Sequence, residues 1–206
     1  MTATEALARL QALKVPVVTT ADAAALLGQS VSAASQVMRR LRAAGLVVSL
    51  RKGLWSVGAA PDRLTLVEYL SAPYPAYVSL QSALYLRGAI SQIPGVVFAV
   101  SLGRSGRIVT TVGTFSVHHI PPELFGGFEY LPDSGVKLAL PEKALIDLLY
   151  LSGTSLRLFR SLPEMELPRG FRLGTARAWI RRIPSPRLRA LVAARFEQVI
   201  AKVREE

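Results

Sequence analysis

The side chains best suited to chemistry lie at helical spacing between residues 32 and 42. At about 100° per residue, Ser35, Gln36 and Arg39 fall within about 60° of Ser32, so the four share one helix face. Glutamine pairs well with the edge of adenine, arginine pairs with guanine, and these polar groups all bind phosphate oxygens. This face therefore offers the chemistry of base-edge and phosphate recognition.

The rest of this segment predicts an amphipathic helix. Arg40 and Arg42 flank the polar face. The opposite, apolar face consists of Ala34, Val37, Met38 and Leu41. Ser30 or Ser32 can cap the start of the helix, and Gly45 stands where helices commonly end. A solvated basic face on an ordinary surface helix would show the same pattern, so the neighbouring elements must decide between the two interpretations.

The segment before this helix predicts a second, shorter helix and a tight turn. Residues 20–27 have helical character with Thr20 as the cap candidate, and Gly28 and Gln29 form the turn. Two helices joined in this way make a helix-turn-helix unit. Further upstream, the chain predicts a first helix and a short strand, at residues 4–13 and 15–18.

The segment after this helix predicts a hairpin with a basic turn. Residues 46–50 and 54–57 are strand-like, and the turn between them carries Arg51 and Lys52. A basic turn suits contact with phosphates or the minor groove, although charges at a hairpin tip also keep a hairpin soluble. Taking these elements in order, we expect residues 1–60 to form a winged helix-turn-helix DNA-binding domain.

The distribution of charge agrees with a polyanionic partner. The 206 residues carry a formal net charge of +11. Residues 1–60 contribute +5, residues 61–150 contribute −1 and residues 151–206 contribute +7. Basic ends around a neutral middle attract nucleic acid through counterion release, without selecting a sequence.

The remainder of the chain predicts a second domain of α+β class, residues 61–206. Gly58 and Pro61 mark the boundary. A helix is expected near 64–70 and another at 80–86, capped by Ser79. Strands are expected at 96–102, 107–112, 114–120, 128–131 and 136–140. Helices are expected at 141–150, 155–162, 175–182 and 186–203. This order predicts an antiparallel or mixed sheet followed by terminal helices.

Several classes of protein are not indicated. The chain has no cysteine, which fits a reducing cytoplasm. It shows no signal peptide and no apolar run of about 20 residues, so we expect a soluble, cytoplasmic protein without a membrane partner. Residues 103–107 lack the lysine of a phosphate-binding loop and read as a hairpin turn that could contact phosphate. We expect no cofactor and no metal.

Catalysis is the weaker interpretation of the remaining polar residues. His118 and His119 are neighbours on a strand and point to opposite faces, so we expect one packed and one surface side chain. Asp133, Glu142, Asp147 and Lys137 faintly resemble the carboxylate cluster of a metal-dependent nuclease. Glu142 stands at an expected helix start, where the helix dipole explains it better. We therefore expect the chain not to be an enzyme.

Basic side chains are also frequent in the last third of the chain. They are Arg172, Arg177, Arg181, Arg182, Arg187, Arg189 and Arg195. A solvated surface whose arginine stems cover apolar neighbours explains most of them. A second nucleic-acid-facing surface is the alternative, because the excess of charge attracts polyanions.

An ordered set of phrases resembles the AbiEi antitoxins of type IV toxin–antitoxin systems. The phrases are RKGLWSV at residues 51–57, YVSLQSALYLRG at 77–88, LPEKALIDLLY at 140–150 and SPRLR at 185–189. The resemblance spans nearly the whole chain. It implies a transcriptional autorepressor with a DNA-binding N-terminal domain and a C-terminal antitoxin domain. Its functional partner would be a nucleotidyltransferase-like toxin, with no stable complex required.

The resemblance and the residue pattern together define the expected site. The expected DNA-binding residues are Ser32, Ser35, Gln36, Arg39, Arg40, Arg42, Arg51 and Lys52. The expected partner is double-stranded DNA of its own promoter, with inverted repeats read by paired subunits, so a dimer on DNA is possible. The alternative is an RNA-interacting or metal-dependent nucleolytic protein that a winged helix targets to its substrate.

Overall fold

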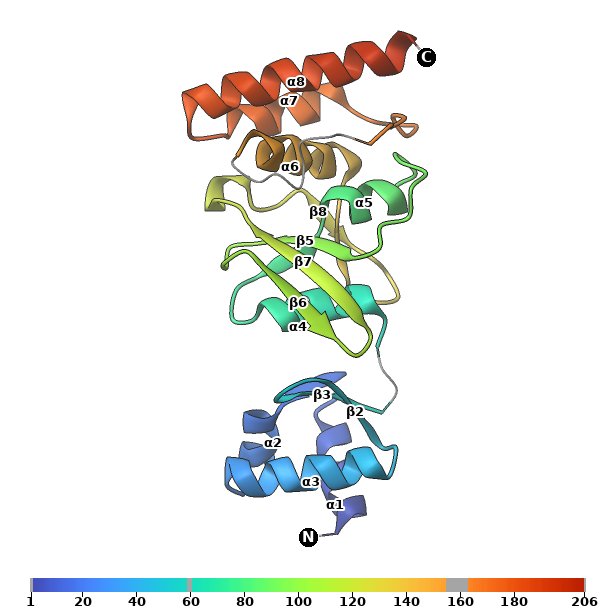
Figure 1. Cartoon of the computed structure of the whole chain (residues 1–206), viewed down its shortest axis with the longest axis vertical. Helices are drawn as coiled ribbons and strands as arrows, with labels where there is room; N and C mark the ends of the chain where they lie inside the picture. Colours follow the sequence, from blue (N-terminus) through green and yellow to red (C-terminus); the bar gives the residue numbers. More distant parts are fainter. Residues whose placement is uncertain (1, 59–60, 155–162, 206) are drawn as a thin grey trace. The chain divides into compact units, whose positions relative to one another are not determined.

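Mixed helices and strands make this an α+β protein, as the sequence predicts (Figure 1). The computed structural model describes residues 2–58, 61–154 and 163–205. The chain divides into two units by its internal contacts. The first comprises Met1–Tyr69 with Val109–Thr114, and the second comprises Leu70–Ile108 with Phe115–Glu206. Of the described helices, none combines the length and apolar character that crossing a lipid bilayer requires.

Three helices and a three-stranded antiparallel sheet form most of the first unit. The elements are α1 (Ala3–Ala12), β1 (Val17–Thr19), α2 (Thr20–Leu27), α3 (Val31–Ala43), β2 (Val47–Arg51) and β3 (Leu54–Val57). The strand order is β1-β3-β2, with β3 antiparallel to both neighbours. Leu10, Met38, Leu41 and Trp55 lie in one buried cluster that joins the helices to the sheet. Burying each such side chain stabilises the fold by roughly 1.5–3 kcal/mol.

The cap of α2 lies one residue before the position predicted from the sequence. Thr19, not Thr20, caps the helix: its hydroxyl accepts the amide of Asp22 at 3.0 Å, and the Asp22 carboxylate accepts the amide of Thr19 at 2.8 Å. The Thr20 hydroxyl instead accepts the indole N–H of Trp55 at 2.9 Å. Two adjacent threonines have equal capping propensity, so the distant tryptophan decides which one is free to cap.

The turn between α2 and α3 has the residues that its geometry requires. Gly28 ends α2 in the left-handed region at φ 63°, where a residue with a β-carbon is strained. The amide of Gln29 then donates to the carbonyl of Ala24 at 3.0 Å. Ser30, and not Ser32, caps α3 by accepting the amide of Ala33 at 3.2 Å. The serine at 32 is therefore left on the outer surface of the helix.

Most of a six-stranded mixed sheet lies in the second unit, and only the hairpin tip Val109–Thr114 is assigned to the first. Its strands are β4 (Ala76–Val78), β5 (Val97–Ser101), β6 (Gly106–Thr110), β7 (Gly113–His119), β8 (Phe128–Tyr130) and β9 (Lys137–Ala139). They lie in the order β6-β7-β5-β4-β9-β8. The pairs β4–β9 and β5–β7 are parallel, whereas β4–β5 and β8–β9 are antiparallel. A short 3-10 turn of this unit occurs at Pro122–Leu124, and another, Arg63–Thr65, lies in the first unit.

Helices cover this sheet in two further layers. The helices of this part of the chain are α4 (Leu66–Ser71), α5 (Leu80–Leu86), α6 (Pro141–Gly153), α7 (Leu173–Arg181) and α8 (Pro186–Glu205). The α5 and α6 helices pack together against the sheet, and α7 and α8 pack on the outer side of α6 (Figure 1). The helix predicted at residues 155–162 lies outside the described residues. This layering places α6 between the sheet and α7–α8, so its side chains are buried nearly all round.

Candidate nucleic-acid interface

The outer face of α3 presents the polar residues that the helical period predicts. Ser32, Gln36 and Arg39 are exposed, and Ser35 is half-buried. On the opposite face, Ala34, Val37, Met38 and Leu41 are all buried. Because the apolar face is fixed in the core, the orientation of α3 is fixed, and its polar face remains available to a partner.

Two more arginines border this face. Arg40 and Arg42 are exposed, on either side of the row that runs from Ser32 to Arg39. None of the three arginines of α3 forms an ion pair or a hydrogen bond with another side chain in the described part of the chain. Their guanidinium groups therefore keep their donors for an external acceptor, such as a phosphate or a guanine edge.

The turn between β2 and β3 adds two exposed cations. Arg51 and Lys52 are both exposed, and Gly53 turns the chain at φ 79°. The carbonyl of Gly53 accepts the amide of Thr20 at 2.9 Å, which ties the turn to the start of α2. The turn is thus held against the helical part of the unit, with its two charged side chains directed to solvent.

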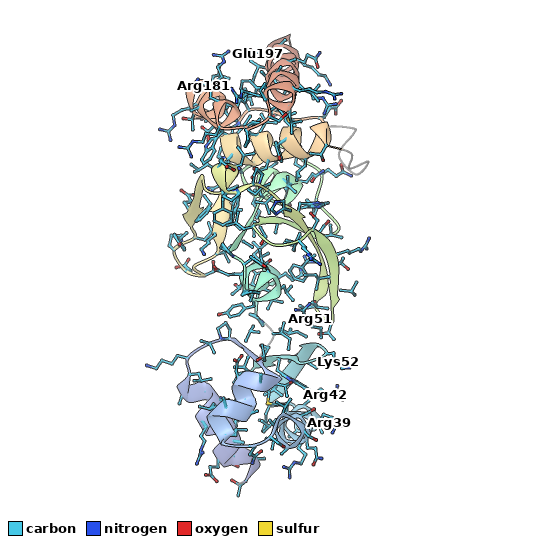
Figure 2. The ribbon with its side chains drawn as sticks, turned by 90° about the vertical axis from the view of Figure 1, so that its left-hand side faces the viewer. Arg39, Arg42, Arg51, Lys52, Arg181 and Glu197 are labelled. Atoms are coloured by element: carbon cyan, nitrogen blue, oxygen red, sulfur yellow. The ribbon has the colours of Figure 1, made fainter. Side chains whose placement is uncertain are left out.

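Four exposed cations lie on one side of residues 2–58 (Figure 2). Arg39, Arg42, Arg51 and Lys52 lie along the same side of the unit (Figure 2). The two carboxylates of residues 2–58 are engaged elsewhere: Glu5 pairs with Arg9 at 3.0 Å within α1, and Asp22 closes the capping box of α2. Together with the polar residues of α3, these cations form the basic face. It consists of Ser32, Ser35, Gln36, Arg39, Arg40, Arg42, Arg51 and Lys52.

Sequence reasoning missed a buried ion pair in the second unit. Lys143 and Asp147, one turn apart on α6, are both fully buried, and the lysine ammonium donates to the carboxylate. The carboxylate also accepts hydrogen bonds from the Ser79 hydroxyl at 2.7 Å and from the Tyr77 hydroxyl at 3.0 Å. Ser79 was expected to cap α5, but its hydroxyl makes no cap bond because it is committed to Asp147.

Aromatic rings surround the Lys143–Asp147 pair, and burial shifts the pKa values of Lys143 and Tyr77. The ammonium of Lys143 lies 5.0 Å from the ring centroid of Trp179 on α7 and 5.5 Å from that of Tyr77. Burial lowers the pKa of Lys143, and the Asp147 carboxylate opposes that effect. Burial and the same carboxylate raise the pKa of Tyr77 well above its ordinary value, so the phenol stays protonated and donates. The cluster therefore joins β4, α6 and α7 in the core.

The carboxylates considered for nuclease chemistry do not come together. Glu142 is buried, and its carboxylate accepts a hydrogen bond from the backbone amide of Arg172 at 2.7 Å. It therefore connects the start of α6 to the start of α7, in addition to any stabilisation by the dipole of α6. Asp147 is held by Lys143, and Asp133 is exposed on the turn between β8 and β9. Among the described residues, no group of three or more His, Asp or Glu side chains is placed to hold a metal ion. Within the described residues, these carboxylates therefore do not form the shared cluster that the sequence pattern suggested.

The two histidines separate as the strand alternation predicts. His118 is buried, its Nε2 lies 2.8 Å from the Ser116 hydroxyl, and its ring stacks on Phe98 with centroids 6.4 Å apart. His119 is exposed at the end of β7, and its Nδ1 lies 3.1 Å from the carbonyl of Gly103. Burial lowers the pKa of His118, so the folded protein favours its neutral form.

The burial of His118 predicts a loss of stability in mild acid. Unfolding returns the imidazole to its ordinary pKa of about 6.5. Below that pH the unfolded chain binds more protons than the folded chain, so the free energy of unfolding falls as pH falls. The wild type should lose stability more steeply than the variant His118→Gln between about pH 7 and pH 5, as measured by urea unfolding. Parallel pH profiles would contradict this assignment.

Many of the C-terminal arginines have partners within the chain. Arg177 donates to the Glu197 carboxylate at 3.1 and 3.2 Å. Arg189 donates to the carbonyl of Ile183 at 2.9 Å, and Arg195 donates to the Ser152 hydroxyl at 2.7 Å. The guanidinium of Arg182 lies 4.3 Å from the ring centroid of Trp179. Arg181 (Figure 2) and Arg187 are exposed, without an ion pair to any described residue. Much of this charge therefore serves the packing of α7 and α8.

No protein-family model matches the sequence, and no curated protein matches it either. The likeness to the AbiEi antitoxins accordingly stays a prediction from the phrases quoted above. The function is therefore inferred from the geometry and charge of the described residues.

Proposed function

We propose that the first unit is a winged helix-turn-helix domain that binds double-stranded DNA. The observation that carries this proposal is the basic face. Its arginines form no ion pair with any residue that the structure describes, and the reverse side of α3 is fixed in the core. A helix is about 10–12 Å across with its side chains, and the major groove of B-DNA is about 12 Å wide, so α3 fits the groove. In this docking, α3 is the recognition helix and the β2–β3 turn is the wing.

The residues of the basic face divide into two roles. Ser32, Ser35, Gln36 and Arg39 follow the middle of the exposed helix face and read base edges. The bordering cations Arg40, Arg42, Arg51 and Lys52 bind phosphates and fix the register of the helix in the groove. Base contacts give the choice of sequence, whereas phosphate contacts give affinity that depends on salt.

The biological role that we propose is transcriptional autorepression together with antitoxicity. The promoter of its own gene would be the target, and inverted repeats there would be read by two copies of the chain. The second unit would oppose a nucleotidyltransferase-like toxin without forming a stable complex with it. This part of the proposal is supported by the resemblance to AbiEi antitoxins, and it is tested by coexpression with any nucleotidyltransferase-like protein encoded beside this chain. Rescue of growth supports it, and continued toxicity contradicts it.

A salt titration tests the DNA-binding proposal directly. If Arg40, Arg42, Arg51 and Lys52 each neutralise one phosphate, the logarithm of the affinity should fall against the logarithm of salt concentration with a slope of about −4 per subunit. Fluorescence anisotropy with a promoter fragment measures that slope. The variant Arg9→Gln is a matched control, because Arg9 is an exposed arginine of α1 that already pairs with Glu5. Affinity that is independent of salt would contradict the proposal.

A further inference from the structure

An open bowl on the second unit is unrelated to the basic face. It has a volume of about 370 Å³ and is lined by Tyr74, Leu102, Gly103, Arg104, Ser105 and His119. These residues come from the loop before β4, from the turn between β5 and β6, and from the end of β7. None of the six lining residues is acidic. The bowl therefore combines a cation, polar donors and an aromatic ring without a competing carboxylate.

One wall of the bowl is an aromatic ring held by a glycine. Tyr74 is 51% exposed, and its side chain lies so close to Gly103 that a β-carbon there would be 2.8 Å from Cδ2 of the ring. A residue with a β-carbon at this position would displace the Tyr74 side chain from its place beside residue 103. An exposed tyrosine positioned by the backbone is suited to stack on a planar ligand, since aromatic rings pair at little cost in conformational entropy.

Two more lining residues of the bowl, His119 and Ser105, carry hydrogen-bonding groups. The Nδ1 of His119 lies 3.2 and 3.1 Å from the carbonyls of Leu102 and Gly103, which can only accept, so this nitrogen carries the proton. Nε2, on the other edge of the ring, is then an acceptor, so it can receive a hydrogen bond from a ligand but cannot donate one to a phosphate oxygen. The Ser105 hydroxyl accepts the amide of His119 at 2.8 Å, which leaves its own proton to donate.

The cation of the bowl is Arg104. Its side chain is exposed and forms no ion pair with a residue in the described part of the chain. A guanidinium beside a hydroxyl donor suits a phosphate group, which accepts several charge-assisted hydrogen bonds at once.

We infer that the bowl is a nucleotide-binding site. Arg104 and Ser105 hold the phosphate, Nε2 of His119 accepts a hydrogen bond from a hydroxyl or amino group of the nucleotide, and the base stacks on Tyr74. The nucleotide is either free or a residue of a single strand, because duplex DNA keeps its bases stacked and offers no free base face. The site is thus separate from the duplex interface of the first unit, and it stands whether or not that proposal holds.

Two neighbouring glycines give a matched test with the full-length protein. Gly103→Ala pushes the Tyr74 ring out of place, whereas Gly106→Ala, at the start of β6, meets no atom within 4 Å. Isothermal titration calorimetry with adenosine 5′-monophosphate, and anisotropy with a labelled single-stranded oligoadenylate, report on the two forms of ligand. We expect saturable binding of at least one, weakened about tenfold or more by Gly103→Ala and by Arg104→Gln, and unchanged by Gly106→Ala.

The outcomes separate the parts of the inference. Binding of the monophosphate indicates a free nucleotide, and binding of the oligoadenylate alone indicates a strand; both support the site. Arg104→Gln keeps the test informative even if Gly103→Ala perturbs folding, because the Arg104 side chain is exposed. The absence of saturable binding to either ligand, or equal affinities of Gly103→Ala and Gly106→Ala, would overturn it. Promoter-duplex binding, measured in parallel, should be the same in all these variants.

Discussion

Replacing Ser35, Gln36 and Arg39 together with alanine is expected to abolish the preference for promoter DNA over unrelated DNA. Each well-formed base contact discriminates by about 1–3 kcal/mol, so losing these contacts should lower the ratio of the two affinities by about a hundredfold or more. Weak, salt-dependent binding should remain, because Arg40, Arg42 and the wing cations still bind phosphates. Anisotropy at one fixed salt concentration, with a promoter fragment and a scrambled fragment, measures the ratio.

A second variant of the same surface serves as the control. Replacing Arg51 and Lys52 with alanine should weaken both fragments equally and make the salt slope shallower by about two. None of these side chains lies in the core of the first unit, so thermal unfolding should be nearly unchanged in both variants. If the alanine variant of α3 still prefers the promoter fragment, α3 is not the recognition helix.

The variant Lys143→Met is expected to destabilise the second unit severely. It leaves Asp147 charged and fully buried, with hydrogen bonds from Ser79 and Tyr77 but without its cation. Removing one partner of a buried ion pair costs about 3–5 kcal/mol of stability, because the remaining charge has lost both its water and its counterion. Urea unfolding, followed by circular dichroism, should show this loss as a lower midpoint.

The double variant Lys143→Met, Asp147→Asn provides the decisive comparison. It removes both charges from the core but keeps an oxygen that can accept from the buried hydroxyls of Ser79 and Tyr77, so it should recover most of the stability that the single variant loses. Arg177→Gln, which removes the exposed pair with Glu197, should leave the free energy of unfolding nearly unchanged. If the double variant is as unstable as the single one, the pair contributes through packing against Tyr77 and Trp179, and not through its charges.

The sequence alone determined the local features of the first unit. The 3.6-residue period separates the buried side of α3 from its polar side, and a serine and two glycines place its start, the preceding turn and its end. These features depend on residues only a few positions apart, so the amino-acid pattern carries them directly. The capping threonine of α2 was misplaced because a distant side chain, Trp55, binds the hydroxyl of its neighbour.

The tertiary structure decided what depends on segments far apart in the chain. It places β4 between β5 and β9, which no local pattern specifies. It buries Lys143 and Asp147, whose spacing is equally typical of an exposed ion pair on a helix surface. It also brings Tyr74 against Gly103 to form the bowl. The period of a helix or strand shows which residues share a face, but only the packing of distant elements determines whether that face meets water, a partner or the core.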